Sequence, residues 1–259
     1  MSFYANKSTD SVTLETLATY VPSAFATRPH EKCSDRYGYI DTQSLVGYFL
    51  EEGYSVASAH GGQRGSSRDF GMHTVRMRAP STSVIVGDLY PEIVITNSHD
   101  RSSRAILDLG IYRGVCSNGL VVGTSAGLRF SIPHVGDQKT AVITAADKAM
   151  EYVPRLQEVV SEWSARQMSP EEMVEFNRRA LIIKPSKGEV DLLATRRNED
   201  RANNLWSVFN RAQENILTGG TSYRNSKGRR STTRPVGSVR KALDTNQRMW
   251  ELAEEFLPA

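Results

Sequence analysis

The chain has few cysteines, no long hydrophobic run and no N-terminal pattern typical of a secretory signal. Its 259 residues include only Cys33 and Cys116, which are too far apart for a disulfide framework or for a zinc ribbon built from CxxC pairs. No apolar run approaches the roughly 20 residues needed to span a bilayer, and the N-terminal sequence lacks the basic-then-apolar order of a secretory signal. We therefore expect a cytoplasmic protein with reduced thiols that does not bind a membrane.

Common catalytic motifs are absent as well. The sequence contains no GxxxxGK[ST] phosphate loop, no GxGxxG, no HExxH and no GxSxG. The stretch GGQRGSS at 61–67 resembles a phosphate loop only superficially, because it lacks the lysine that reaches the terminal phosphates. The sequence favours a protein that is not an enzyme, hydrolyses no nucleotide and needs no cofactor or metal.

What the chain does contain is a series of strand-like runs between residues 54 and 134, separated by Gly, Ser, Asn and Asp. They predict an α+β fold: an antiparallel sheet of about five or six strands backed by helices, with a helical C-terminal region. In residues 73–78 the alternation puts His73, Val75 and Met77 on one face and Thr74, Arg76 and Arg78 on the other. That pattern predicts a half-buried strand with a basic outer face.

Helical periodicity and capping residues mark the remaining elements. Asp41 and Ser169 are expected N-caps, and Ser169 is followed by Pro170 and Glu172 in the pattern of a capping box. Helices are expected at about 41–53, at 138–168 with a bend or break near Pro154, and at 169–183, 200–217 and 238–257. We expect an N-terminal arm at 1–38 that packs loosely, an α+β core domain at 39–168, and a helical region at 169–259 interrupted by an irregular basic loop at 218–237.

Arginines suggest a nucleic-acid partner, although the formal net charge is only +3. One group belongs to the C-terminal basic loop and a second group belongs to the predicted sheet. Guanidinium groups bind phosphate oxygens through forked contacts, and a tyrosine can stack on an unpaired base. The candidate nucleic-acid-binding residues are Arg64, Arg68, Arg76, Arg78, Arg101, Arg113, Tyr223, Arg224, Lys227, Arg229, Arg230 and Arg234. The two groups could line one groove, or they could be unrelated solvated charges.

A second cluster has the residue types of a catalytic or metal site: His99, Asp100, Cys116, Asn118 and His134. With His60 and His73, these residues could bind a metal, but none has the close spacing of a zinc motif. Cys116, a histidine and Asn118 could form a nucleophile, a base and an orienting amide. The alternatives are structural: a small thiol in a strand, a tight turn at Asn118 and local hydrogen bonds after a strand end.

The segments NSHD, IYRGVCSNGLVV and IPH resemble the phage/plasmid-like proteins grouped as domain of unknown function 932. The resemblance runs from about Gly38 to Ala165, and the matching positions are Asn97, His99, Asp100, Arg113, Cys116, Asn118, Gly119 and His134. The family usually has a small residue, often glycine, after NSHD, where this chain has Arg101. The resemblance implies a product of a mobile element, and by analogy only the fold is similar to phage single-strand annealing proteins of the Red Beta kind.

We therefore expect an oligomeric protein that binds single-stranded DNA or RNA without ATP and that could anneal strands during phage or plasmid recombination or replication. Two alternatives stay open. The protein could instead bind and inhibit a host defence complex, or the Cys/His cluster could serve an enzyme.

Overall fold

The computed structural model describes residues 2–4, 13–62, 64–80, 89–113, 119–121, 129–132 and 138–258. The chain forms two compact units: unit 1 comprises residues 1–114 and 128–153, and unit 2 comprises residues 115–127 and 154–259. The sequence patterns instead predict an arm at 1–38, a core domain at 39–168 and a helical region at 169–259. Residues 13–25 form helices within unit 1, and residues 154–165 contribute to the core of unit 2.

Unit 1 is built on an antiparallel sheet. Strands β1 to β5 lie side by side in chain order, and β7 also pairs with β5. The strands are β1 (Ser2–Tyr4), β2 (Ser55–His60), β3 (His73–Arg78), β4 (Leu89–Asn97), β5 (Ala105–Arg113) and β7 (Arg129–Ile132). The α+β prediction is confirmed. Strand β1 was not predicted, since three residues are too few to show an alternating pattern.

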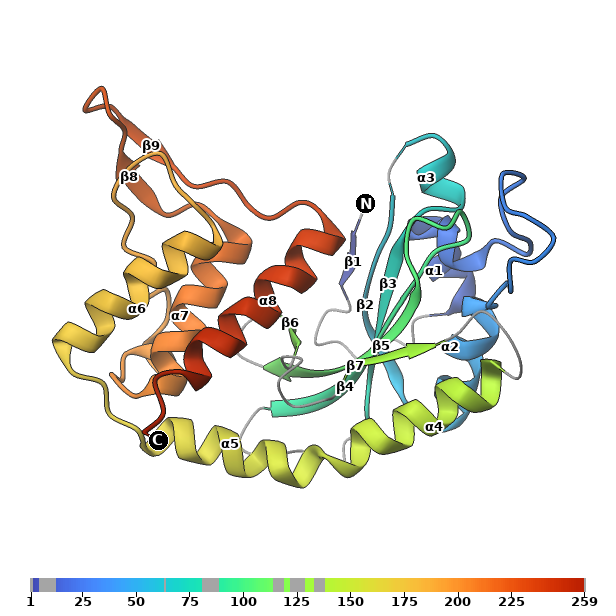
Figure 1. The fold of residues 1–259 in the computed structure, drawn as a ribbon, viewed down its shortest axis with the longest axis horizontal. Helices are drawn as coiled ribbons and strands as arrows, with labels where there is room; N and C mark the ends of the chain where they lie inside the picture. Colours follow the sequence, from blue (N-terminus) through green and yellow to red (C-terminus); the bar gives the residue numbers. More distant parts are fainter. Residues whose placement is uncertain are drawn as a thin grey trace. The chain divides into compact units, whose positions relative to one another are not determined.

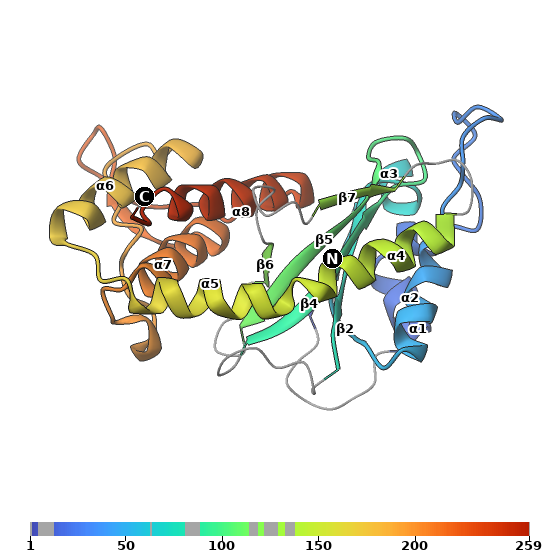
Figure 2. The ribbon, with the colours of Figure 1, turned by 60° about the horizontal axis from the view of Figure 1, so that its bottom comes forward.

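Most of the helices of unit 1 pack against this sheet (Figures 1 and 2). The helices of this unit are α1 (Leu14–Tyr20), the 3-10 turn η1 (Pro22–Phe25), α2 (Thr42–Glu51), α3 (Ser66–Asp69) and α4 (Gln138–Glu151). The predicted cap of α2 is confirmed, because the Asp41 carboxylate accepts a hydrogen bond from the Ser44 amide at 3.2 Å. Leu17 and Val21 are fully buried, so this part of the predicted arm belongs to the core rather than packing loosely.

The two faces of the sheet differ in chemistry but not in burial. The apolar face carries Val75 and Met77 of β3, and the polar face carries Thr74, Arg76 and Arg78. Thr74 is 4% exposed and Arg76 is 8% exposed. The prediction that β3 has a basic face open to solvent was therefore wrong, because alternation along one strand cannot reveal what covers its polar face.

Unit 2 is a helical assembly of α5 (Val153–Ala165), α6 (Pro170–Ile183), α7 (Leu205–Thr218) and α8 (Val239–Glu254), with the 3-10 turn η4 (Asn198–Asp200) and the short strand β6 (Gly119–Val121). The break between α4 and α5, the capping box at Ser169 and the last helix confirm the predictions. Within the described part of the chain, no helix has the length and apolarity required to cross a bilayer.

An aromatic cluster forms the core of unit 2. The rings of Trp163 and Trp250 have their centroids 4.5 Å apart, and Phe209 contacts Trp163 edge-on at 5.4 Å. These three side chains are fully buried on α5, α8 and α7. Aromatic pairs at these distances contribute about 0.5–1.5 kcal/mol each beyond the area they bury. All three tryptophans of the chain lie in unit 2.

The segment predicted to be an irregular loop contains a β-hairpin. Strands β8 (Ser222–Arg224) and β9 (Arg230–Thr232) pair antiparallel and extend from the helices of unit 2 (Figure 1). The prediction of irregular structure at 218–237 was wrong for these residues. High polarity argued against a packed core, but a hairpin can form from backbone hydrogen bonds and a favourable turn.

Candidate nucleic-acid interface

The hairpin turn is fixed by Asn225. Its side-chain oxygen accepts hydrogen bonds from the amides of Lys227 and Arg229, both at 3.0 Å, and Gly228 has a φ of 70°. Asparagine at the start of a turn and glycine in the left-handed conformation are the residues that such a turn favours. The turn therefore sets the backbone that carries Lys227 and Arg229.

The base of the hairpin is tied to α7. The amide of Gly220 donates to the Thr233 carbonyl at 2.8 Å, and the amide of Val236 donates to the Leu217 carbonyl at 2.9 Å. Gly219 has a φ of 65°, and a Cβ there would lie 2.5 Å from the Arg234 carbonyl carbon, so only glycine fits. The hairpin is consequently anchored to a buried helix at its base.

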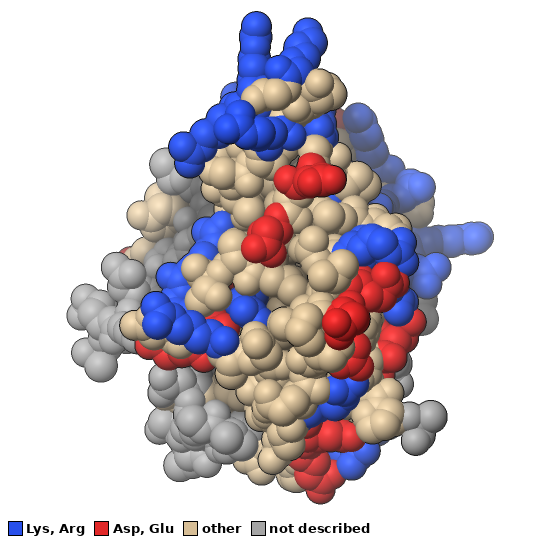
Figure 3. Space-filling model, turned by 90° about the vertical axis from the view of Figure 1, so that its left-hand side faces the viewer, with Lys and Arg blue, Asp and Glu red and all other residues tan. Residues whose placement is uncertain are grey.

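The basic side chains of this segment are exposed, and Figure 3 shows Lys and Arg side chains gathered over the hairpin. We call the hairpin cations Arg224, Lys227, Arg229 and Arg230. None of them forms an ion pair within the described part of the chain. Residues 218–237 contain no aspartate or glutamate. Their positive charge is therefore not neutralised locally.

Two of these arginines occupy paired positions across the hairpin, where Arg224 Nη1 donates to the Gly228 carbonyl at 3.0 Å and Arg230 Nη2 donates to Ser222 Oγ at 3.4 Å. The register pairs Arg224 with Arg230, one on each strand. Like charges directly opposite each other destabilise a strand pair. A pair of like charges that breaks this rule, with no carboxylate to compensate the charges, is typical of a functional position. An anion bound between these side chains would remove the repulsion.

Tyr223 lies on the other face of the hairpin. Strand residues alternate between faces, so Tyr223 and its partner Ser231 face away from Arg224 and Arg230. Tyr223 and Ser231 are half-buried, whereas the two arginines are exposed. Of the candidate residues in this region, the structure therefore places Arg224 and Arg230 on one face of the hairpin and Tyr223 on the opposite face.

The arginines of β3 have a different environment. The carboxylate of Glu92 is fully buried and accepts a hydrogen bond from Arg76 Nε at 2.6 Å and one from Arg78 Nη2 at 3.4 Å. The side chain of Arg76 is 10% exposed and that of Arg78 is 23% exposed. Their charges are thus compensated inside the protein, which argues against a role as phosphate ligands.

A second ion pair lies on the same polar face. Arg129 of β7 donates to both carboxylate oxygens of Asp108 of β5, at 2.8 and 3.2 Å. Burial raises the pKa of Asp108, and Arg129 only partly opposes this rise. Burial lowers the pKa of His60 to about 4, and the nearby positive charge of Arg76 contributes to this decrease. This face holds a network of compensated charges.

The other candidate arginines of unit 1 are distributed among loops and a strand end. Arg64 and Arg68 are exposed at α3, and Arg101 is exposed with a φ of 68°. Glycine adopts that backbone conformation without strain, whereas a residue with a side chain adopts it rarely. The side chain of Arg113 lies outside the described residues. The predicted groove would require residues of both units, and it stays a prediction.

The NSHD segment (Asn97–Asp100) forms structural hydrogen bonds. The Asn97 amide group donates to the Ile40 carbonyl at 3.1 Å and to Thr42 Oγ1 at 3.0 Å. The same hydroxyl lies 2.9 Å from His73 Nε2. Burial, assisted by nearby His99, lowers the pKa of His73 to about 3. These contacts connect strand ends to the start of α2, and they are long-range, whereas the structural alternative expected local hydrogen bonds after the strand end.

The rest of the Cys/His cluster is only partly visible. His99 is fully buried, with its ring 4.9 Å from the Tyr39 ring and 5.1 Å from the His73 ring. Asp100 accepts a hydrogen bond from the Ser102 amide in a local turn at 2.9 Å. Cys116, Asn118 and His134 lie outside the described residues. Among the residues that are described, no group of three or more acidic, histidine or cysteine residues could hold a metal ion.

Sequence reasoning missed the residues that shape the hairpin's surroundings. The spacing of Asn225 and Gly228 was a usable signal for a tight hairpin turn. Lys184 was not detectable, because its ammonium group donates to carbonyls of Ile216 and Arg234, which lie far away in the sequence. Local patterns carry no information about such distant contacts.

The structure is that of an α+β protein with a protruding basic hairpin. The model of the family described as a domain of unknown function, DUF932, matches residues 29–250, and the chain belongs to that family. Two relatives from Escherichia coli (strain K12), UPF0380 protein YafZ and UPF0380 protein YfjQ, are each 34% identical over 253 residues. Each alignment covers 95% of this chain and 92% of the relative. No solved structure matches the chain.

Proposed function

We propose that this protein binds single-stranded nucleic acid through the hairpin cations, without hydrolysing a nucleotide. The observation that carries the proposal is the pairing of Arg224 with Arg230 in a segment free of acidic residues. Phosphate groups would relieve this repulsion and release their condensed counterions. Arginine suits the task because its planar donors match phosphate oxygens in a forked geometry.

The hairpin is also suited to a flexible strand by its shape. It projects from the helices of unit 2, and its cations are exposed on both sides of a narrow turn (Figures 1 and 3). A single strand can wrap such a projection, because its backbone bends more readily than that of a duplex. The proposal relies on the hairpin and does not use Arg76 or Arg78, whose charges Glu92 already compensates.

The proposal extends to strand annealing in phage or plasmid recombination or replication, in the cytoplasm of a bacterial host. Annealing requires several binding sites held close together, and a homo-oligomer would supply one hairpin per subunit. Electron microscopy of the purified protein with and without single-stranded DNA tests this extension. Rings or filaments that form on DNA would support it, and single particles indifferent to DNA would contradict it.

The binding step is tested with a charge-removing variant of the hairpin. Arg224→Gln, Arg229→Gln and Arg230→Gln are combined, and affinity for a fluorescent 30-nucleotide oligonucleotide is measured from 50 to 300 mM salt. The logarithmic salt dependence should flatten by about 0.7 for each phosphate that the variant no longer neutralises, or about 2 in total. Affinity at the lowest salt should fall at least tenfold.

A control variant tests whether the loss of a single exposed charge outside the hairpin has an effect on binding. Lys241→Gln removes an exposed charge from α8, away from the hairpin, and should leave both quantities within error. Tryptophan fluorescence verifies that unit 2 of each variant is folded, since all three tryptophans lie there. Unchanged affinity and salt dependence in the triple variant would refute the proposed role of the hairpin.

A further inference from the structure

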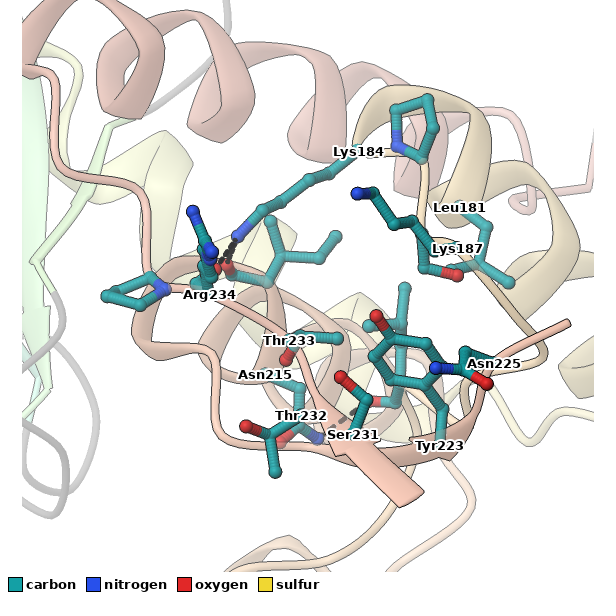
Figure 4. A pocket seen from close by; sticks show the side chains of 15 residues that line it. Leu181, Lys184, Lys187, Asn215, Tyr223, Asn225, Ser231, Thr232, Thr233 and Arg234 are labelled. Atoms are coloured by element: carbon teal, nitrogen blue, oxygen red, sulfur yellow. Dashed lines mark hydrogen bonds between the residues drawn. The ribbon is translucent and has the colours of Figure 1, made fainter. Parts of the chain in front are cut away.

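A pocket lies between the hairpin and the end of α6, entirely within unit 2. Its volume is about 480 Å³, within the range of about 300–1,000 Å³ that is usual for small-molecule sites. Figure 4 shows its walls: the end of α6 and the loop after it on one side, α7 at the base, and the hairpin on the other side. Tyr223 and Ser231, the residues on the inner face of the hairpin, line it.

The pocket has the chemistry of an anion site with an aromatic wall. Lys184, Lys187 and Arg234 line it, and none of its lining residues is acidic. The exposed Lys187 and Arg234 form no ion pair within the described part of the chain. Tyr223 adds a ring, and Asn225 and Ser231 add groups that can donate and accept hydrogen bonds. The lining favours a ligand with both a negative charge and a planar group.

The walls of the pocket are held in place without a ligand. The Lys184 ammonium donates to the Ile216 carbonyl at 2.6 Å near the end of α7, and it also donates to the Arg234 carbonyl. Partial burial lowers the pKa of Lys184. A Cβ at Gly188 would clash with the Arg224 carbonyl oxygen, so the loop after α6 packs directly on β8. Such preorganisation reduces the entropy cost of binding.

We propose that this pocket binds one nucleoside phosphate, with its base against Tyr223 and its phosphate beside Lys187 and Arg234. The ligand could be a terminal nucleotide of a bound strand or a free nucleotide, since the two share this chemistry. The first case rests on the function proposed above, with the hairpin cations holding the following phosphates. In that case the pocket binds the terminal nucleotide of the strand, and the opposite face of the hairpin binds the sugar-phosphate backbone of the strand.

Calorimetric titration of the full chain with deoxyadenosine 5′-monophosphate tests the pocket. The nucleotide should bind at least tenfold more tightly than deoxyadenosine or inorganic phosphate alone, because each of these lacks one of the two recognised groups. Lys187→Gln and Tyr223→Leu should each weaken nucleotide binding at least fivefold. Lys187 is exposed, so its variant keeps the test valid if Tyr223→Leu does not fold.

The control Lys241→Gln should bind the nucleotide with the affinity of the unchanged protein. Failure of the nucleotide to bind, or equal binding by Lys187→Gln, would overturn the pocket proposal. A preference of the unchanged protein for a 5′-phosphorylated oligonucleotide over the same oligonucleotide with a 5′-hydroxyl, abolished by Lys187→Gln, would support a strand end as the ligand. Nucleotide binding without such a preference would support a free nucleotide.

The two proposals can fail independently. The triple hairpin variant retains every residue that lines the pocket, so it should still bind the mononucleotide while its affinity for the oligonucleotide falls. Weaker oligonucleotide binding in that variant, combined with no mononucleotide binding by any form, would retain the proposed function and reject the pocket. Mononucleotide binding, combined with an unchanged oligonucleotide affinity in the triple variant, would retain the pocket proposal and reject the proposed function of the hairpin.

Discussion

The arginines of the sheet and those of the hairpin are the same residue type in opposite environments. Arg76 and Arg78 lie over the buried carboxylate of Glu92, whereas Arg224 and Arg230 occupy paired, exposed positions and form no ion pair within the described part of the chain. A buried ion pair is costly to break because the remaining charge stays desolvated, and an exposed arginine costs almost nothing to remove. We infer that the sheet arginines support the fold and that the hairpin arginines are available to bind a partner.

Removing the carboxylate of the buried group should have the largest effect. Glu92→Gln keeps the shape of the side chain but leaves Arg76 and Arg78 without their counter-charge, and the unfolding free energy of unit 1 should fall by about 3–5 kcal/mol. Urea unfolding followed by circular dichroism and amide hydrogen exchange measures this decrease. In the control Glu158→Gln the exposed pair with Arg155 is broken, and the unfolding free energy of unit 2, which contains this pair, should fall by at most about 1 kcal/mol. Equal decreases in the two variants would abolish the contrast between buried and exposed charges.

Acid should destabilise unit 1 more than unit 2, because all five histidines lie in unit 1. Folding lowers the pKa of His73 to about 3 and that of His60 to about 4, so the unfolded chain takes up protons first as the pH falls below about 6.5. The unfolding free energy of unit 1 should therefore decrease between pH 6.5 and pH 5, with a limiting slope of about 1.4 kcal/mol per pH unit for each histidine.

Hydrogen exchange in unit 1 measures this decrease, and tryptophan fluorescence follows unit 2 in the same samples. His73→Asn should reduce the pH dependence of the unfolding free energy of unit 1 by up to about 1.4 kcal/mol per pH unit, and it should leave the tryptophan signal of unit 2 unaffected. The same slope in the variant would show that burial of His73 is not the cause of the acid sensitivity.

The ion pair between Asp108 and Arg129 should give a smaller effect than Glu92. Arg129 is 31% exposed, so water can solvate its guanidinium when the carboxylate is removed. Burial already raises the pKa of Asp108, which means that the ionised carboxylate gains little in this position. Asp108→Asn should therefore cost about 1 kcal/mol, measured as for Glu92→Gln. A cost as large as that of Glu92→Gln would show that exposure of the partner does not set the energy of the pair.

Much of the secondary structure could be predicted from the sequence, because caps and alternation are local signals. Asp41, Ser169 and the change of pattern near Pro154 indicated where helices begin or break, and the structure confirms them. The hairpin has such a signal too, in Asn225 and Gly228, although the high polarity of its surroundings is typical of an irregular loop.

The amino-acid sequence by itself determined the α+β class, most of the helices and strands, and a basic C-terminal segment without acidic residues. Only the tertiary structure decided what each charged residue does. The register of β3 and β4 places Arg78 opposite Glu92, and the pleat of the hairpin separates Tyr223 from Arg224. The walls of the pocket likewise come from segments distant in sequence. The energy of a charge depends on its solvation and on its neighbours in space, and residues far apart in the chain become neighbours only when it folds.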